Sequence, residues 1–316
     1  MFMRNAFVLG FLFWLLILCP ALAGSWTSGA PLQTGRAGLG VVVLQNKIYA
    51  VGGSGILMPL GNTETYQPGM GGWRIDADLP VGLESFGMAE IGGKLYAAGG
   101  YAADTNGHPT ERMWEFDPIN DGWVQGPSMP SARANFALVA AAGKLYAFGG
   151  TGPDAEKAFV YSPQKRQWHI LEQGLSDSRD LAAVALGQNI YVIGGGPAAN
   201  PTAVVHIFDT STNSWTQGPA MPSARSGHAV TVFKGEIHVL GGRSGGRGVS
   251  LSDHWVLDIE VGQWTQAEPM PAPRTGAKAV TLGEAIYLIG GGAGGGFFAP
   301  FTAIAETDVW RPSQSK

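Results

Sequence analysis

The sequence is poor in cysteine and in charge, and both shortages exclude classes of protein. Its 316 residues include one cysteine, and only 14% are Asp, Glu, Lys or Arg. The formal net charge of -4 leaves no overall basic character that would recruit nucleic acid or an anionic membrane. No Asn-x-Ser/Thr glycosylation site has a permissive middle residue, since Asn200-Pro201-Thr202 is blocked by its proline.

The single long apolar run stands at the N-terminus and has the pattern of an export signal. Arg4 precedes an apolar stretch over residues 6–19, Pro20 ends it, and Ala21-Leu22-Ala23 provides small residues for cleavage. Fourteen apolar residues are short for a membrane span, and Leu18 before Cys19 disfavours lipoprotein processing. We therefore expect a signal peptide over residues 1–23 and one domain over residues 24–316.

Cleavage at that point decides the chemistry open to the mature chain. Cys19 is removed, so disulfides and thiol catalysis are excluded. Losing Arg4 leaves 19 basic against 24 acidic residues, a net charge of -5. These features predict a periplasmic or secreted bacterial protein without an integral membrane span, and we expect a monomer.

Glycine and a repeated pattern are what the sequence has in abundance. With 48 glycines, 20 prolines and no collagen period, the composition favours many short strands joined by tight turns. Six double glycines each follow a run rich in β-branched and aromatic residues, such as Lys47-Ile48-Tyr49-Ala50-Val51. The pairs begin at Gly52, Gly99, Gly149, Gly194, Gly241 and Gly290, with spacings of 47, 50, 45, 47 and 49 residues.

A tryptophan precedes every double glycine at a constant distance. Trp26, Trp73, Trp123, Trp168, Trp215 and Trp264 each lie 26 residues before the first glycine of a pair. Between a pair and the next tryptophan comes a third strand that ends in a turn such as Phe116-Asp117-Pro118. Each repeat thus predicts four strands.

The double glycine with its upstream tyrosine, the Asp-Pro turn and the spaced tryptophan resemble the Kelch repeat. The resemblance covers residues 24–316 and implies an all-β fold, a six-bladed Kelch-type β-propeller. The sixth repeat has Trp310-Arg311-Pro312 but no later tryptophan, whereas Trp26 has no repeat before it. We therefore expect the N-terminal strand to close the ring as the outer strand of the last blade, with Trp26 buried.

The candidate site lies on the face where repeat length varies. From the first glycine of each pair to the third-strand turn there are 15, 18, 13, 15, 17 and 21 residues, while the rest of the repeat keeps its length. Arginines recur at the start of the inner strands, with polar side chains close by. The predicted ligand-binding residues are Arg36, Glu84, Arg133, Asn135, Arg179, Asp180, Arg225, His228, Arg243 and Arg274. They predict a channel mouth that attracts anions, unless the arginines instead bind backbone carbonyls.

Catalytic motifs are weak. Residues 290–295 satisfy G-x-G-x-x-G and residues 242–246 satisfy G-x-S-x-G, but no helix is expected after either. The six histidines have no metal-ligand spacing, so we expect no metal, cofactor or catalytic residue.

Two functional hypotheses follow. The first is a binding module for a protein or an acidic carbohydrate, with no nucleic-acid partner. The alternative is an isomerase, a sugar mutarotase or epimerase that resembles N-acetylneuraminate epimerase and the periplasmic sialic acid mutarotases. In that case Glu84 would be the acid/base group and an arginine would bind the sugar carboxylate.

Overall fold

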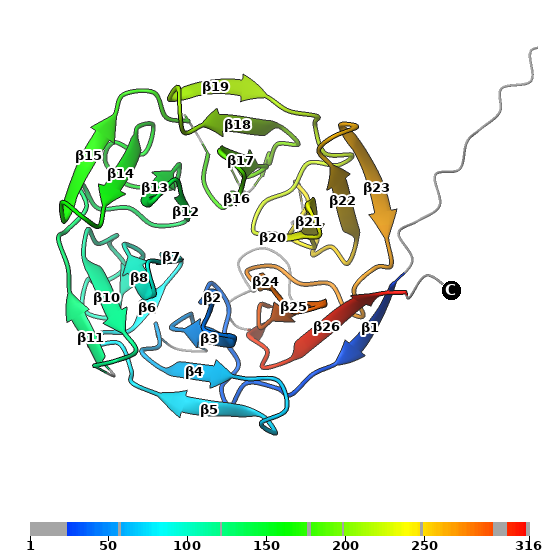
Figure 1. The fold of residues 1–316 in the computed structure, drawn as a ribbon, viewed down its shortest axis with the longest axis horizontal. Helices are drawn as coiled ribbons and strands as arrows, with labels where there is room; N and C mark the ends of the chain where they lie inside the picture. Colours follow the sequence, from blue (N-terminus) through cyan, green and yellow to red (C-terminus); the bar gives the residue numbers. More distant parts are fainter. Residues whose placement is uncertain are drawn as a thin grey trace, which may run out of the picture.

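Six four-stranded antiparallel sheets surround a central axis in a computed structural model of the protein (Figure 1). The structure describes residues 24–55, 58–120, 122–175, 178–197, 199–246, 249–292 and 302–313. The predicted signal peptide, residues 1–23, lies outside these ranges. Within the described part of the chain no helix is long and apolar enough to cross a membrane. The prediction of a six-bladed all-β propeller is confirmed.

Blades 1 to 5 run from the axis outwards through four strands in chain order, and blade 6 takes its outermost strand from the N-terminus. The innermost strands, in blades 1 to 6, are β2 (Gly40–Leu44), β7 (Gly87–Ile91), β12 (Ala137–Ala141), β16 (Ala182–Leu186), β20 (Ala229–Phe233) and β24 (Lys278–Leu282). The second strands are β3 (Lys47–Val51), β8 (Lys94–Ala98), β13 (Lys144–Phe148), β17 (Asn189–Ile193), β21 (Glu236–Leu240) and β25 (Ala285–Ile289).

The third and fourth strands form the outer half of each blade. The third are β4 (Thr63–Tyr66), β10 (Met113–Asp117), β14 (Ala158–Ser162), β18 (Val205–Asp209), β22 (His254–Asp258) and β26 (Thr307–Pro312). The outermost are β5 (Trp73–Asp76), β11 (Gly122–Gln125), β15 (Gln167–Leu171), β19 (Ser214–Gln217), β23 (Gln263–Ala267) and β1 (Gly24–Ser28). A short extra pair, β6 (Leu83–Glu84) and β9 (Tyr101–Ala102), belongs to blade 2.

The N-terminal strand closes the ring, as the repeat alignment predicts. β1 pairs antiparallel with β26, and Trp26 stands opposite Trp310 in that register. In Figure 1 the first and last parts of the chain lie side by side in one blade. Pairing of the two ends protects strand edges that an open fan would leave exposed.

The six spaced tryptophans fasten each blade to the one before it. Every indole N–H donates a hydrogen bond to a backbone carbonyl just after the preceding outermost strand. The acceptors for Trp26, Trp73, Trp123, Trp168, Trp215 and Trp264 are Glu268, Ala30, Ala77, Pro127, Gln173 and Pro219, at 2.9 to 3.2 Å. Trp26 is only partly buried, which corrects the expectation of full burial, and it packs edge-on against His254.

The double glycines form the second contact between blades. At all six pairs both residues have positive φ, and the second N–H donates to the carbonyl that lies ten residues after the next tryptophan, as in Gly100 N to Arg133 O at 2.8 Å. A Cβ on Gly99 would approach that same oxygen to 2.4 Å. Glycine is therefore required for both backbone conformation and close approach.

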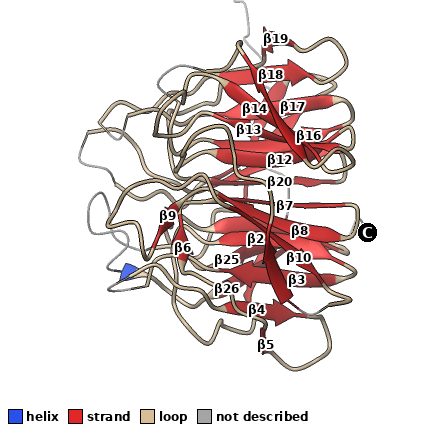
Figure 2. Ribbon diagram, turned by 90° about the vertical axis from the view of Figure 1, so that its left-hand side faces the viewer, coloured by secondary structure: helices blue, strands red, loops and turns tan. Residues whose placement is uncertain are grey.

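The variable connections gather on one face of the disc. In Figure 2 the loops between second and third strands project to one side, where β6 and β9 also lie, and short hairpin turns occupy the other. We call the first side the long-loop face. The innermost strands begin on this face, so the axis opens there among residues from all six blades.

Candidate functional site at the axial mouth

A closed ring of six backbone hydrogen bonds surrounds the axis on the long-loop face. One residue from each blade donates its N–H to the carbonyl of the equivalent residue in the preceding blade, and the sixth bond returns to the first. The members of this axial ring are Gly38, Ser85, Asn135, Asp180, Gly227 and Gly276, with donor–acceptor distances of 2.7 to 2.9 Å. Each lies twelve residues after one of the spaced tryptophans. The repeat therefore continues into the geometry of the mouth.

Every residue of the axial ring has left-handed backbone, with φ between 54° and 66°. Glycine fits this conformation without strain, and Asn and Asp tolerate it better than other residues. Blades 1, 5 and 6 supply glycine, whereas blades 2, 3 and 4 supply Ser85, Asn135 and Asp180. Polar side chains thus occupy one half of the mouth and leave the other half open.

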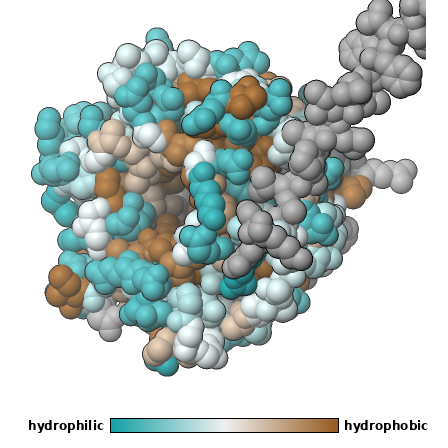
Figure 3. All heavy atoms as spheres, turned by 45° about the vertical axis from the view of Figure 1, so that its right-hand side comes forward, coloured by the Kyte–Doolittle hydropathy of each residue, from teal (hydrophilic) through white to brown (hydrophobic). Residues whose placement is uncertain are grey.

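Two small cavities lie on the axis. The first, of about 80 Å³, is lined by the six residues of the axial ring, their neighbours and Lys278. The second, of about 110 Å³, lies among the innermost strands and is also lined by Lys278 and by His228. Figure 3 views the molecule obliquely from the side with the hairpin turns, opposite the long-loop face, and shows that end of the axis hollowed, with hydrophobic side chains in the hollow. Pockets for small organic ligands typically enclose about 300–1,000 Å³, so each described cavity suits one functional group.

Asp180 is the carboxylate at the mouth, and cations surround it. Arg243 crosses from blade 5 and donates from its guanidinium to Asp180 Oδ2 at 2.6 Å, while its Nε donates to Ser226 Oγ at 3.2 Å. Burial raises the pKa of Asp180, and the charges of Arg243, Arg179 and Lys278 oppose that rise. Three cations therefore act on one carboxylate, which leaves the mouth with an excess of positive charge.

His228 lines both cavities and stays uncharged. Its side chain is 3% exposed, and both ring nitrogens are buried away from solvent. Burial, with repulsion from Arg225 and Lys278, lowers the pKa of His228 to about 3. His228 therefore contributes an uncharged wall to both cavities.

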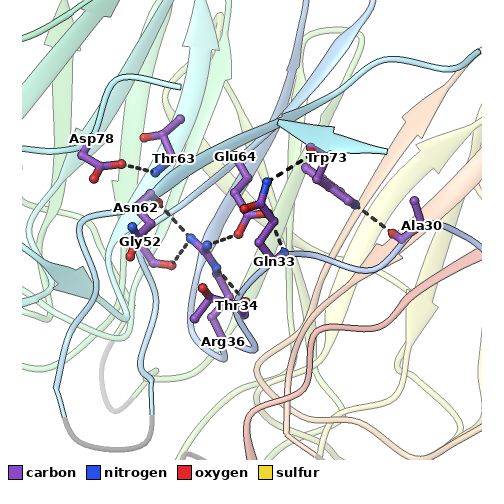
Figure 4. Close-up of polar contacts among 10 residues, drawn as sticks. All are labelled: Ala30, Gln33, Thr34, Arg36, Gly52, Asn62, Thr63, Glu64, Trp73 and Asp78. Atoms are coloured by element: carbon purple, nitrogen blue, oxygen red, sulfur yellow. Dashed lines mark hydrogen bonds and ion pairs between the residues drawn. The ribbon is translucent and has the colours of Figure 1, made fainter. Parts of the chain in front are cut away.

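Four of the predicted arginines form hydrogen bonds inside the blades and do not line the mouth. Figure 4 shows Arg36 enclosed in blade 1, where its guanidinium donates to the carbonyls of Gly52 at 3.1 Å and Asn62 at 2.8 Å and pairs with Glu64. Its Nε also donates to the carbonyl of Thr34. Arg36 is fully buried and Glu64 is 2% exposed. No side of this guanidinium faces the axial cavities.

Arg225, Arg274 and Arg133 repeat the arrangement in other blades. Arg225 forms two hydrogen bonds to the carboxylate of Asp253, at 2.6 and 2.8 Å, and Arg274 pairs with Asp308. Arg133 has no carboxylate partner among the described residues; it donates to the Asp154 carbonyl at 2.6 Å and lies 3.9 Å from the centre of the Phe159 ring. We therefore no longer assign these four arginines to ligand binding, because they are buried inside the blades and line neither axial cavity.

The other predicted site residues lie at or near the mouth. Asn135, Asp180 and His228 line the first cavity together, and Arg243 binds Asp180. Arg179 is exposed beside Asp180. Glu84 lies on β6, paired with Tyr101, and does not line either axial cavity.

Sequence reasoning missed Ser85 and Lys278 as lining residues. Both had a signal in the repeat alignment. Ser85 stands twelve residues after Trp73, at the position of the axial ring, and Lys278 stands fourteen after Trp264, where the other repeats have glycine or alanine.

The comparisons with known proteins agree with this architecture. The Kelch motif matches residues 84–130, 132–173, 178–222 and 224–271, more than half of the chain. The chain belongs to the Kelch-repeat family. In this Kelch protein the matched units correspond to blades 2 to 5, and the remaining two blades have the same strand order in the structure.

Individual relatives match over short segments. A Kelch repeat-containing protein of Arabidopsis thaliana is 31% identical over 83 residues, which are 25% of this chain and 20% of that protein. Kelch-like protein 21 of Danio rerio is 36% identical over 87 residues, 27% of this chain and 14% of that protein. The Kelch chain thus matches less than a third of the length of these relatives. The solved structure of YjhT has the same fold, with a TM-score of 0.75, 17% identity, and coverage of 88% of this chain and 95% of that one.

Proposed function

We propose that this chain is an exported binding module that takes acidic groups of a protein or glycan at its axial mouth. The observation that carries the proposal is the charge at that mouth. Arg179, Arg243 and Lys278 act together on the single carboxylate of Asp180, at the point where three glycines leave the axial ring open. In a chain with net charge -4, this is a local reversal of sign.

Binding accounts for the mouth better than catalysis does. The lining carboxylate, Asp180, is held by Arg243 instead of standing free as an acid/base group. Glu84, the group required by the isomerase hypothesis, lies outside the lining of both cavities. Cavities of about 80 and 110 Å³ accept one acidic group of a larger ligand, whose remainder would lie across the long-loop face. No observation on the described residues favours the isomerase, which stays a prediction.

Export to the periplasm or exterior is part of the proposal. Its support is the apolar run over residues 6–19 with the small residues at 21–23, followed at once by β1, whose first residue is Gly24. Sequencing the N-terminus of the exported protein tests this point, and a chain that begins at Gly24 is expected.

The binding proposal is tested with an array of acidic and neutral ligands. Oligogalacturonate and poly-glutamate represent acidic glycans and peptides, and dextran and poly-glutamine are the neutral controls. We expect binding to the acidic members only, weakened by added salt because charges at an open mouth are screened. Replacing Arg243→Gln should weaken that binding at least tenfold, since a charge-assisted hydrogen bond contributes about 1.5–3 kcal/mol.

A matched variant separates the mouth from general surface charge. Arg74 is exposed on the outermost strand of blade 1, so Arg74→Gln removes the same charge far from the axis. It should leave binding unchanged. Equal losses in the two variants, or a parent protein that binds neutral and acidic ligands alike, would contradict the proposal.

A further inference from the structure

Lys278 is an exception within an otherwise uniform layer of the propeller. It is the first residue of β24, and the equivalent positions of the other innermost strands are occupied by small residues: Gly40, Gly87, Ala137, Ala182 and Ala229. Those residues carry at most a methyl group into the channel. Lys278 alone carries a long side chain there, and it lines both cavities.

The ammonium group of Lys278 has no hydrogen bond or ion pair in the described part of the structure. Burial lowers the pKa of Lys278, and attraction to Asp180 opposes this only in part. Asp180 is already bonded to Arg243. A lysine that is desolvated without a bonded counter-ion is unfavourable for folding, so a purely structural role gives no account of its presence.

The groups that face Lys278 are suited to an anion. On the same cavity wall stand the Ser85 hydroxyl and the Asn135 side chain, whose amide nitrogen already donates to Tyr101 Oη at 3.2 Å and to Thr151 Oγ1 at 3.4 Å. His228, also in the wall, is uncharged and adds no charge of either sign. Arg243 and Arg179 add positive charge from the rim, and Asp180 is the one carboxylate in the lining. A hydroxyl donor beside an ammonium group can bind a carboxylate.

We propose that the cavity inside the axial ring is a carboxylate subsite in which the Lys278 ammonium pairs with the bound group. This inference rests on the proposed function and names the residue that confers it. The carboxylate belongs either to a small free acid or to the end of a longer acidic ligand. The three glycines of the axial ring, Gly38, Gly227 and Gly276, keep the approach open.

Acetate titrations followed by NMR test the subsite directly. The probes are acetate, its uncharged analogue acetamide, and poly-glutamate, and the signals are the Lys278 Nζ and the Asn135 side-chain amide. We expect acetate to shift both signals saturably and acetamide to shift neither. Poly-glutamate should bind more tightly than acetate if the natural ligand is a longer chain, and no more tightly per carboxylate if it is a small acid.

Variants supply the decisive comparison. Lys278→Ala places in blade 6 the residue that blades 3, 4 and 5 already have, so it should fold with an unchanged or raised melting temperature. Its affinity for acetate, read from the Asn135 amide, should fall at least tenfold. Lys144→Ala removes an exposed lysine from the first position of β13 and should change nothing.

The outcomes distinguish this subsite from the wider proposal. If poly-glutamate binds the parent and Lys278→Ala equally well, the Lys278 subsite is wrong while binding of acidic ligands at the mouth stands. If acetate leaves the Lys278 and Asn135 signals unmoved, the subsite is also wrong. If no acidic probe binds the parent protein, both proposals fail together.

Discussion

At the scale of single residues, backbone conformation decides which side chains the mouth can carry. The six positions of the axial ring all require positive φ, and glycine, Asn and Asp fill five of them. Ser85 is the exception, with φ of 54°. At these six ring positions a side chain requires some backbone strain, so the polar half of the axial ring is also its strained half.

Relief of that strain can be measured at Ser85. Ser85→Gly should raise the free energy of unfolding by about 0.5–1 kcal/mol, because removing Cβ relieves left-handed strain and outweighs the added freedom of the unfolded chain. Ser85→Ala, which removes the hydroxyl but keeps Cβ, is the control and should give no gain. Urea unfolding of the three proteins compares these values, and a Ser85→Gly protein less stable than the parent would contradict the geometry.

The buried arginines make a second prediction at this scale. Arg225→Gln should lower the free energy of unfolding by about 2–4 kcal/mol, since it leaves Asp253 without its charged partner. The estimate lies below that for a fully enclosed pair because Asp253 is 23% exposed. Binding to acidic ligands should persist in the folded variant. An Arg225→Gln protein that keeps its stability but has lost ligand binding would contradict the structural role and indicate that Arg225 binds the ligand.

Residues of the site were predictable only in part. Asn135, Asp180, His228 and Arg243 emerged from the sequence because polar residues near a recurring turn are easily noticed. The four recurring arginines were wrongly assigned for the same reason: their recurrence at one position in four of the six blades reflects a structural requirement, here the bonds to the Gly52 and Gly241 carbonyls. Lys278 was missed because it departs from the repeat, where the other five blades have glycine or alanine, and attention went to residues that recur.

At the scale of elements, the outer strands transmit contact around the ring through their tryptophans. Each indole packs on the connection that follows the outermost strand of the preceding blade, and its N–H donates to a backbone carbonyl of that connection. The blades are therefore linked in series. β1 is the link that joins the last blade to the first. Its tryptophan is also the neighbour of a buried pair, His254 with His238, whose nearest ring nitrogens are 2.8 Å apart.

A pair of substitutions at Trp26 tests this link. Trp26→Phe keeps most of the packing but loses the bond to the Glu268 carbonyl, and should cost about 1 kcal/mol. Trp26→Ala should cost about 2–3 kcal/mol, less than for a fully buried tryptophan because the side chain is only partly covered. Thermal or urea unfolding measures both. If both variants are as stable as the parent, closure of the ring does not depend on the contacts of Trp26.

At the scale of the whole molecule, stability should depend on pH through buried histidines. Burial first, then repulsion by His254, lowers the pKa of His238 to about 3, and burial lowers that of His254 to about 4. His228 behaves alike, with a pKa of about 3. In the unfolded chain these imidazoles accept protons near pH 6.5. Between pH 6.5 and about 4 the unfolded state therefore binds more protons, and the stability present above pH 6.5 is lost as the pH falls.

Urea unfolding at pH 7 and pH 5 measures this effect. Below pH 6.5 each such histidine lowers the free energy of unfolding by at most about 1.4 kcal/mol per pH unit. The free energy of unfolding should therefore be a few kcal/mol lower at pH 5 than at pH 7. In NMR spectra the three imidazoles should stay neutral down to pH 5. Titration of any of them near pH 6.5 in the folded protein would contradict the account.

The fold itself was predictable from the sequence almost in full. Constant spacing between tryptophan and double glycine specifies strand order, blade number and the closing strand, because identical repeats must form identical sheets. The hydrogen-bonded axial ring and the small axial cavities were not predictable, since they depend on how six blades meet around the axis. The partial exposure of Trp26 was not predictable either, since the equivalent Trp73, Trp123 and Trp168 on other outermost strands are buried.

Hydrogen exchange with and without an acidic ligand tests the central claim most directly. Poly-glutamate, or whichever acidic member of the array binds, should protect amides on the long-loop face, around residues 84–88, 133–137, 178–182 and 274–278. The hairpin turns on the opposite face, such as residues 45–46 and 142–143, should exchange unchanged. Protection confined to the hairpin face or to the outer strands would place the ligand elsewhere and contradict an axial mouth built to receive acidic groups.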